Sequence, residues 1–151
     1  MRKASPNDVA LLVEFMEEFY AEGGYPLHHR RAAAAFATLL TDERLGQVWL
    51  IQADSKEVGH VVMTLCFAME YGGLIGFVDD LFVQRPFRGK GLATAALAEV
   101  RRFCERRGVR ALFVETGHDN ASARAVYQRA GFTNTDRLLL ALKLAEPTHE
   151  G

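Results

Sequence analysis

The sequence has few of the features that mark exported, membrane or nucleic-acid-binding proteins. Its two cysteines, Cys66 and Cys104, are too few for a disulfide framework, so we expect two reduced core residues in a cytoplasmic protein. It has no signal-peptide pattern and no apolar run of about 18 residues, so we expect no membrane-spanning helix. Basic and acidic side chains nearly cancel, at 18 against 19, which gives no global attraction for nucleic acid or an anionic membrane.

What the chain does have is enough apolar sequence for one core. With 151 residues, 49% hydrophobic content and no internal repeat, we expect a single domain over residues 1–145 and a frayed tail over residues 146–151.

Periodicity predicts an alternation of helices and strands. Apolar residues at helical spacing, bounded by caps and glycines, predict helices over about 6–22, 28–40, 92–107 and 120–131. Runs of β-formers predict strands over about 2–4, 48–51, 58–69, 74–84, 111–114 and 135–144.

The connections between these strands predict a mixed sheet. Three consecutive strands joined by short turns favour an antiparallel meander, with Trp49 and Phe67 in the core. A helical crossover then joins Leu81–Val83 to Ala111–Val114, so these two should be parallel. The last strand has too many leucines for one exposed face, so it is either buried on both sides or paired with another subunit, and we expect a homodimer.

The stretch from Val78 to Thr94 predicts an anion site. A strand ends at Pro86, a loop follows with Gly89 and Gly91, and a helix starts directly after it. Glycines allow positive φ and close approach of a ligand, and the first turn of a helix offers unpaired N–H groups and partial positive charge. The loop also carries three basic side chains, at Arg85, Arg88 and Lys90. A phosphate or pyrophosphate fits such a site.

Two common phosphate loops match this stretch poorly. A Walker A loop needs Ser or Thr after its lysine, but Gly91 follows Lys90. A dinucleotide fingerprint is a near miss, with two of three glycines and Glu115 as a possible ribose ligand, but most of the strand-like sequence precedes the loop. A dinucleotide-dependent oxidoreductase therefore remains a minor alternative.

Two motifs resemble those of the GNAT superfamily of acyl-CoA-dependent N-acyltransferases. Arg88-Gly89-Lys90-Gly91-Leu92-Ala93 is similar to its pyrophosphate loop, Arg/Gln-x-x-Gly-x-Gly/Ala. Asn120 to Phe132 resembles its second motif, Asn-x-x-Ala-x-x-x-Tyr-x-x-x-Gly-Phe. The order of elements is also similar to the GNAT fold over nearly the whole chain.

The resemblance implies an α+β fold, that is, a three-layer α/β arrangement in which an antiparallel meander is followed by two parallel strands that splay apart between about four helices. Acetyl-CoA is the implied cosubstrate, with its pantetheine arm in the gap between the splayed strands. The implied cofactor-binding residues are Phe82, Val83, Arg88, Gly89, Lys90, Gly91, Leu92, Ala93, Thr94 and Asn120.

The implied reaction moves an acetyl group to a primary amine by direct attack. An amine with pKa near 10 must lose a proton before it attacks, and Asp79 and Asp80 lie where a base is needed. On a regular strand only one of the two would face the site, and a bulge would change which one. By the resemblance, the Val83 amide donates to the oxyanion and Tyr127 protonates the leaving thiolate. Without the motif, Tyr127 is a helix residue packing on Phe132.

The acceptor is expected to be a small cationic amine. By analogy with the family, Tyr20, Glu22, Tyr25 and Glu70 line its pocket, and with the two aspartates they would make it acidic and aromatic. Alternatives are a protein N-terminal or lysine acetyltransferase and a non-catalytic acyl-CoA-binding regulatory domain. His28 and His29 suggest a metal site, but neighbouring histidines on a helix diverge, so no metal is expected.

Overall fold

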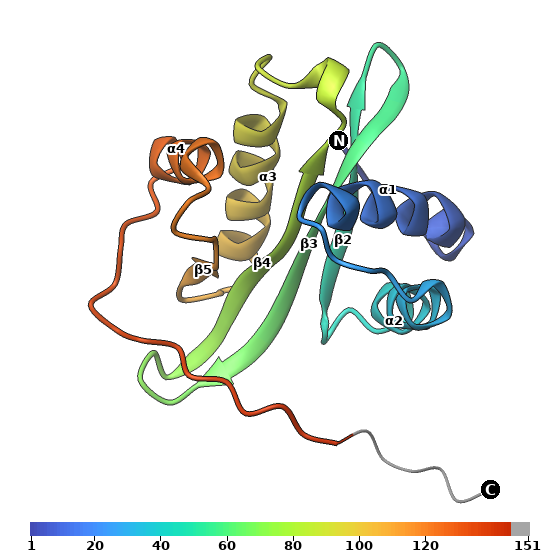
Figure 1. The fold of residues 1–151 in the computed structure, drawn as a ribbon. Helices are drawn as coiled ribbons and strands as arrows, with labels where there is room; N and C mark the ends of the chain where they lie inside the picture. Colours follow the sequence, from blue (N-terminus) through green and yellow to red (C-terminus); the bar gives the residue numbers. More distant parts are fainter. Residues whose placement is uncertain (146–151) are drawn as a thin grey trace, which may run out of the picture.

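A computed structural model describes residues 1–145 as one mixed sheet with helices on both faces (Figure 1). The strands are β1 (Arg2–Lys3), β2 (Gly46–Ala53), β3 (Lys56–Ala68), β4 (Gly73–Val83) and β5 (Leu112–Val114). The helices are α1 (Val9–Glu22), α2 (His29–Thr41), α3 (Leu92–Arg106) and α4 (Ala121–Arg129), with 3-10 turns at Pro6–Asp8 and Arg85–Phe87. The predicted tail over 146–151 lies outside the described residues.

The sheet has the order β1-β2-β3-β4-β5, which confirms the predicted fold class. The pairs from β1 to β4 are antiparallel, and β4 and β5 are parallel. The sequence predicted that Leu81–Val83 runs parallel to β5. In the structure it is Gly76–Val78 that pairs with Leu112–Val114. β4 and β5 therefore pair near the middle of β4 and are no longer paired after Val78.

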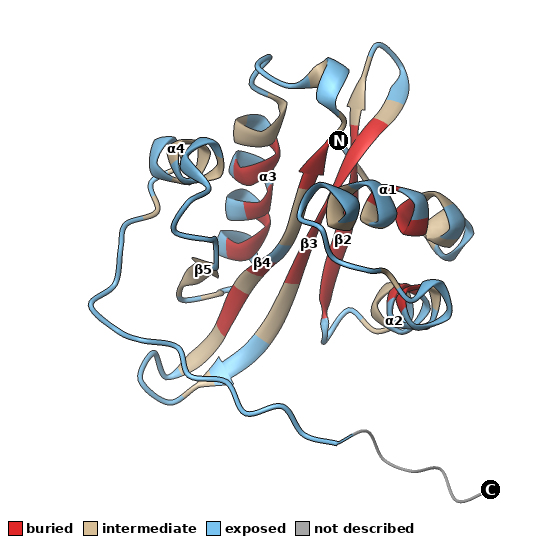
Figure 2. Ribbon diagram, viewed as in Figure 1, coloured by how far each residue is buried: buried red, intermediate tan, exposed pale blue. Residues whose placement is uncertain are grey.

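Each face of the sheet has its own core. One cluster packs α1 and α2 on one face, around Leu12, Phe36 and Leu50. The other packs α3 and α4 on the opposite face, around Leu97 and Val100. Figure 2 shows that the buried residues of the sheet lie in β2, β3 and β4, where these strands pass between the helical layers.

The first helical segment begins where its capping residues predict. The Asp8 carboxylate accepts hydrogen bonds from the Ser5 N–H (2.7 Å) and Ser5 hydroxyl (2.9 Å), and Pro6 takes the first helical position. Arg2 of β1 donates to both oxygens of the same carboxylate, at 2.8 and 3.0 Å. Asp8 thus ties the first strand to the first helix.

Three predictions about the core and the last strand are wrong. Phe67 is 64% exposed and Cys66 is exposed, because the outer ends of β3 and β4 extend past the helices that cover the sheet (Figure 2). Trp49 and Cys104 are buried, as predicted. Residues 135–144 form no strand, because they lie beyond the sheet without a neighbouring strand to pair with.

Candidate active site

The loop between β4 and α3 has the backbone geometry of an anion site. Gly89 and Gly91 have φ of 73° and 78°, in the left-handed region that favours glycine, and Gly91 is the N-cap of α3. Ala95 N–H donates to Gly91 C=O (2.9 Å), so the amides of Leu92, Ala93 and Thr94 precede the first bond of the helix. These N–H groups can donate hydrogen bonds to an anionic ligand, and a Cβ at either glycine would meet no protein atom within 4 Å.

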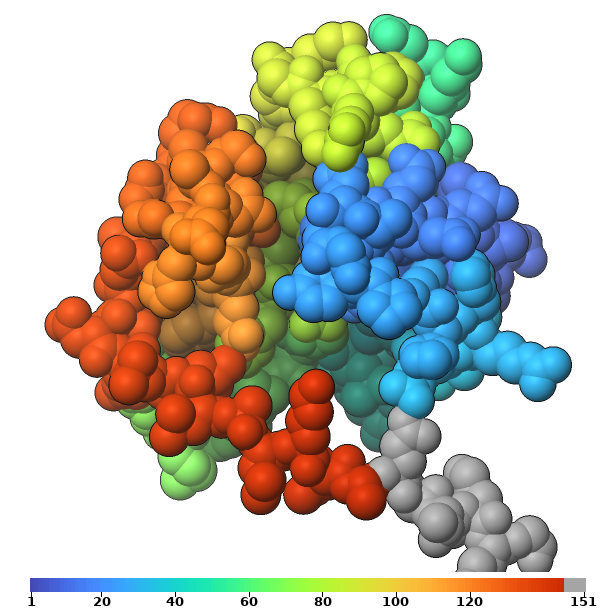
Figure 3. Space-filling model, in the orientation of Figure 1, coloured from blue at the N-terminus to red at the C-terminus, as the bar shows by residue number. Residues whose placement is uncertain are grey.

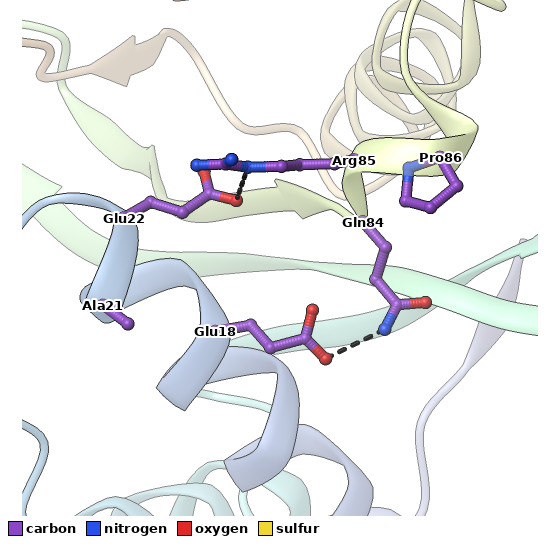
Figure 4. A pocket seen from close by; sticks show the side chains of 6 residues that line it. All are labelled: Glu18, Ala21, Glu22, Gln84, Arg85 and Pro86. Atoms are coloured by element: carbon purple, nitrogen blue, oxygen red, sulfur yellow. Dashed lines mark hydrogen bonds and ion pairs between the residues drawn. The ribbon is translucent and has the colours of Figure 1, made fainter.

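Arg88 fastens this loop to the end of β4 and to α1. Its Nε donates to the Val83 carbonyl (2.6 Å), and its Nη2 donates to both oxygens of Glu22 (2.7 and 2.9 Å). Figure 4 shows Arg85 reaching the same carboxylate (3.3 Å) and Gln84 donating to Glu18 (2.9 Å). The α1 C-terminus is therefore joined to the loop by polar contacts on the outer side of the molecule, around a shallow hollow.

A larger cleft of about 730 Å³ opens on the other side of this loop. Its walls come from the end of α1, the end of β4, the start of α3 and the inner side of α4. In Figure 3 the hollow lies between α4 and α1, with β4 at its floor. Of the predicted cofactor-binding residues, the structure brings these to its lining: Phe82, Val83, Arg88, Gly89, Gly91, Leu92, Ala93, Thr94 and Asn120. Lys90 is the one predicted loop residue outside that lining; its ammonium lies 5.5 Å from the Phe87 ring centre.

The floor of the cleft has unpaired backbone on one edge. β5 pairs with β4 only over Gly76–Val78, so the five residues from Asp79 to Val83 have no neighbouring strand there among residues 1–145. Gln84 N–H donates to Val58 C=O across the β3–β4 ladder (2.8 Å). Since successive amides alternate in direction along a strand, the Val83 N–H points to the open edge.

A β-bulge decides where the two aspartates point. Val62 pairs with Asp80 and the next residue, Met63, pairs with Val78, so Asp79 is the extra residue. Val78 packs in the α3 core and Phe82 in the α1 core. Asp80 therefore shares the α1 face with Phe82, and Asp79 is only partly exposed at the bulge.

His60 is a neighbour of Asp80 that the sequence analysis missed. Its side chain is fully buried, with the ring stacked on Phe15 (6.2 Å between centres, 4° between planes), and neither nitrogen has a hydrogen-bond partner. Its Nε2 lies 3.8 Å from Asp80 Oδ2. A histidine alternating with valines in a strand reads as core from sequence, so only the β3–β4 register reveals this pairing.

Tyr127 lines the cleft, and it forms an electrostatic group with Tyr20 and the two aspartates, which are not among the lining residues. Burial and the negative charges of Asp80 and Glu115 raise the pKa of Asp79. Burial and the charges of both aspartates raise the pKa of Tyr20, and burial and Asp80 raise that of Tyr127. Asp80 is therefore within electrostatic reach of a phenol from each helix, Tyr20 of α1 and Tyr127 of α4, and Asp79 is within reach of Tyr20. For Glu115, which follows β5, the sequence predicts only a possible role as a ribose ligand.

Helix α4 presents Tyr127 to the cleft. Asn120 caps the helix, accepting a hydrogen bond from the Ala123 N–H (3.2 Å), as predicted. Tyr127 is half-buried and meets Phe132 edge to face, with ring centres 5.7 Å apart. Both the packing contact and the cleft position predicted for this tyrosine occur together.

The predicted acceptor residues are not all gathered at the cleft. Tyr20 faces the aspartates, and Glu22 lines the cleft while bound to Arg88. Tyr25 is 69% exposed in the connection between α1 and α2. Glu70, in the β3–β4 turn, accepts a hydrogen bond from Arg137 (2.8 Å). Of the four, Glu22 lines the cleft, and Tyr20 lies near it, within electrostatic reach of both aspartates.

Comparison with known proteins places this site in a family. A family model described as "Acetyltransferase (GNAT) family" matches residues 10–132. The chain belongs to the GNAT acetyltransferase family. An aminoglycoside N(6')-acetyltransferase type 1 from Stenotrophomonas maltophilia is 26% identical over 98% of this chain and 95% of its own.

Solved structures agree on the fold. An integron cassette protein from the mobile metagenome of Cole Harbour Salt Marsh is 50% identical, with a TM-score of 0.88 over 99% of this chain and 93% of its own. A predicted acetyltransferase from Clostridium acetobutylicum, solved with acetyl-CoA, is 20% identical, with a TM-score of 0.80 over 93% of this chain and 94% of its own.

The protein is an acetyl-CoA-dependent N-acetyltransferase, and its cleft fits that cosubstrate. The positive-φ glycines, the amides at the start of α3 and the open edge of β4 lie along one continuous lining. No group of three or more potential metal ligands occurs within residues 1–145, and no helix there is long and apolar enough to cross a membrane.

Proposed function

We propose that this enzyme acetylates a primary amine of a small cationic molecule, by direct attack while both substrates are bound. The observation that carries the proposal is the cluster of Asp79, Asp80, Tyr20 and Tyr127 where β4 is left without a neighbouring strand. Carboxylates attract a cation over a distance and aromatic faces contact it directly. The Stenotrophomonas relative bears the name of an aminoglycoside acetyltransferase, and aminoglycosides belong to this chemical class.

We assign the two aspartates different tasks because the bulge gives them different surroundings. Asp80, on the α1 face beside His60 and Tyr20, holds the ammonium group. Asp79, partly exposed at the bulge and with a raised pKa, accepts the proton that the ammonium must lose before it attacks.

The remaining groups serve the acyl transfer itself. Acetyl-CoA supplies an acyl carbon activated as a thioester. The Val83 N–H, on the open edge of β4, donates to the oxyanion as the new C–N bond forms. As the C–S bond breaks, the Tyr127 hydroxyl gives its proton to the sulfur, and the phenolate takes up the proton that the attacking nitrogen loses as the amide forms. A phenol is protonated at neutral pH, and burial and Asp80 raise the pKa of Tyr127 further.

The acceptor class is tested with a substrate panel. Release of the CoA thiol is followed with aminoglycosides, polyamines, amino acids and peptides bearing a free N-terminus or lysine. We expect turnover with at least one of the first two groups. Turnover of peptides alone would favour a protein acetyltransferase, and cofactor binding without transfer to any amine would favour a regulatory domain. Thermal shift reports that binding, because a ligand at about 100 times its Kd adds ~2.7 kcal/mol of stability.

The assigned roles are tested with single substitutions. Tyr127→Phe should lower kcat by about 10²-fold or more, as expected for loss of a positioned acid, with acetyl-CoA still bound. Glu99→Gln on the exposed side of α3 is the control and should match the parent. A Tyr127→Phe enzyme with full turnover would remove the acid role.

His60 is tested as a positioning residue for Asp80. His60→Phe fills the same aromatic surroundings without a nitrogen facing the carboxylate. We expect the acceptor KM to rise about tenfold, or ~1.4 kcal/mol, with kcat and melting temperature near those of the parent. His60→Gln, which restores an amide nitrogen at similar reach, should recover part of the affinity. Equal KM values in all three proteins would contradict this role.

We also propose that the enzyme works in the cytoplasm as a homodimer. Both cysteines are free in the structure, which suits a reducing compartment. The support for a dimer is the C-terminal segment 138–144, in which five leucines are exposed in the single chain.

A further inference from the structure

The last turn of α1 ends in a carboxylate that the electrostatics of a helix disfavour. Glu22 is the C-terminal residue of α1, and no basic residue lies in the last turn. A helix has partial negative charge at its C-terminus, which repels a carboxylate there. Two guanidinium groups from outside the helix hold Glu22 instead. Arg88 donates to both of its oxygens, at 2.7 and 2.9 Å, and Arg85 donates to one of them at 3.3 Å (Figure 4).

The cation that holds Glu22 most closely also belongs to the anion site. Arg88 lies in the glycine loop before α3, and it lines the cofactor cleft together with Glu22. A guanidinium binds phosphate oxygens in the same fork geometry in which it binds a carboxylate. In this structure, the carboxylate of Glu22 therefore makes the contacts with Arg88 that a phosphate group would make.

Few other polar contacts join the end of α1 to its surroundings. The N–H groups of residues 23–25 donate to carbonyls of α1 itself, and Gly24 has a φ of 73°, which turns the chain away directly after the helix. One turn before Glu22, Glu18 accepts a hydrogen bond from Gln84 (2.9 Å). Of these two side-chain attachments of α1, only that of Glu22 is an ion pair with the loop.

The turn that Glu22 holds contributes to the active site. Phe19 lines the cleft, and its ring centre lies 5.8 Å from that of Phe82 in the cleft floor. Tyr20 is within electrostatic reach of Asp80. A movement of the α1 end would therefore change the side of the cleft on which we propose that the acceptor binds.

We propose that Glu22 is an internal competitor of the acetyl-CoA diphosphate for Arg88, so that cofactor binding releases the last turn of α1. Once the diphosphate binds the Arg88 guanidinium, Glu22 is left beside two sources of negative potential, the ligand and its own helix end. Part of the binding free energy of the cofactor breaks the ion pair, so Glu22 lowers the affinity for coenzyme A. This competition requires the cofactor alone, whatever the acceptor and the roles of Asp79 and Asp80.

The first test is the Kd of the full chain for coenzyme A, measured by calorimetry. Glu22→Gln keeps the shape of the side chain and an oxygen that accepts from Arg88, but it removes the charge. We expect the Kd to fall by about fivefold or more, as is usual for coupled equilibria. If Glu22 instead orients Arg88 for the diphosphate, the same substitution raises the Kd. A raised or unchanged Kd would overturn the proposal.

Two further variants show whether the effect passes through Arg88. Glu18→Gln removes the same charge one turn earlier, where the partner is the neutral Gln84, and should leave the Kd within about twofold of the parent. In an Arg88→Gln background, Glu22→Gln should change the Kd by no more than about twofold, because the group for which the two anions compete is gone. Equal tightening by Glu18→Gln, or full tightening without Arg88, would contradict the competition.

The second test follows the end of α1 by hydrogen exchange. The N–H groups of residues 23–25 are bonded to carbonyls of the last turn, so their exchange reports when that turn opens. We expect saturating coenzyme A to speed their exchange by about fivefold or more in the parent. In Glu22→Gln the exchange should already be fast without the ligand. Unchanged or slower exchange in the parent on binding coenzyme A would show that the turn is not released.

Discussion

The two ends of the sheet differ in how much of their surface the chain itself covers. At the β2–β3 side, helices α1 and α2 cover one face and α3 the other, and side chains such as Leu12, Leu50 and Val61 are fully buried. At the β5 side, a three-residue strand and the nine-residue α4 contain no fully buried residue. The core at the first end is covered by the chain itself, so we call it the closed end. We call the β5 side the open end. We propose that at the second end acetyl-CoA, the acceptor and a second copy supply the missing contacts.

The strongest test of this contrast removes the same atoms from leucines at the two ends. Leu12→Ala should lower the free energy of unfolding by about 2–5 kcal/mol, because the cavity lies in a closed core. Leu140→Ala, in protein diluted to monomer, should change it by less than about 0.5 kcal/mol. Urea denaturation of both gives the comparison. Similar losses would mean that the leucine segment is packed within the monomer.

A second test probes how tightly the closed end holds the floor of the cleft. A Cβ at Gly59 of β3 would lie 2.1 Å from the Phe82 carbonyl oxygen, so Gly59→Ala must push β3 and β4 apart. We expect a loss of about 1–3 kcal/mol and weaker acetyl-CoA binding. Gly117→Ala, near the open end, meets nothing within 4 Å and should melt like the parent. Calorimetric melting with and without acetyl-CoA distinguishes the two.

A third test uses acid at the closed end. Hydrogen bonds from Arg2 hold the pKa of Asp8 well below its usual range. The carboxylate therefore stabilises the fold fully above its unfolded pKa of about 3.9, and this contribution is lost as pH falls below that value. Asp8→Asn should cost about 1–2 kcal/mol at pH 7 and progressively less below pH ~4. Urea denaturation of both proteins at pH 7 and below pH ~4 measures this difference. A difference in unfolding free energy that stays the same at both pH values would contradict the role of the Asp8 charge.

The smallest expected effect is a shift in the pH profile of activity, at the open end of the sheet. Burial, Asp80 and Glu115 together raise the pKa of Asp79, so Glu115→Gln should lower it. A base works when deprotonated, and the acidic limb of the kcat/KM profile should therefore move to lower pH. Glu99→Gln serves again as the control. An unchanged limb would indicate that Asp79 is not the titrating base.

The sequence alone determined the elements whose signals are local. Ser5 to Asp8 start the first helical segment, Gly91 opens α3 and Asn120 caps α4, because each depends on hydrogen bonds or φ values within a few residues. The two family motifs likewise predicted a glycine loop before α3 and a tyrosine on α4, which line the same cleft.

Only the tertiary structure decided which residues pair across the strands and which apolar side chains are buried. The bulge opposite Val62 and Met63 separates Asp79 from Asp80, and the pairing of β3 with β4 brings His60 to Asp80. Phe67 and the leucines of 138–144 have the composition of core residues and are exposed, because burial depends on which elements lie above them. Such contacts join residues far apart in the chain, and no local preference specifies them.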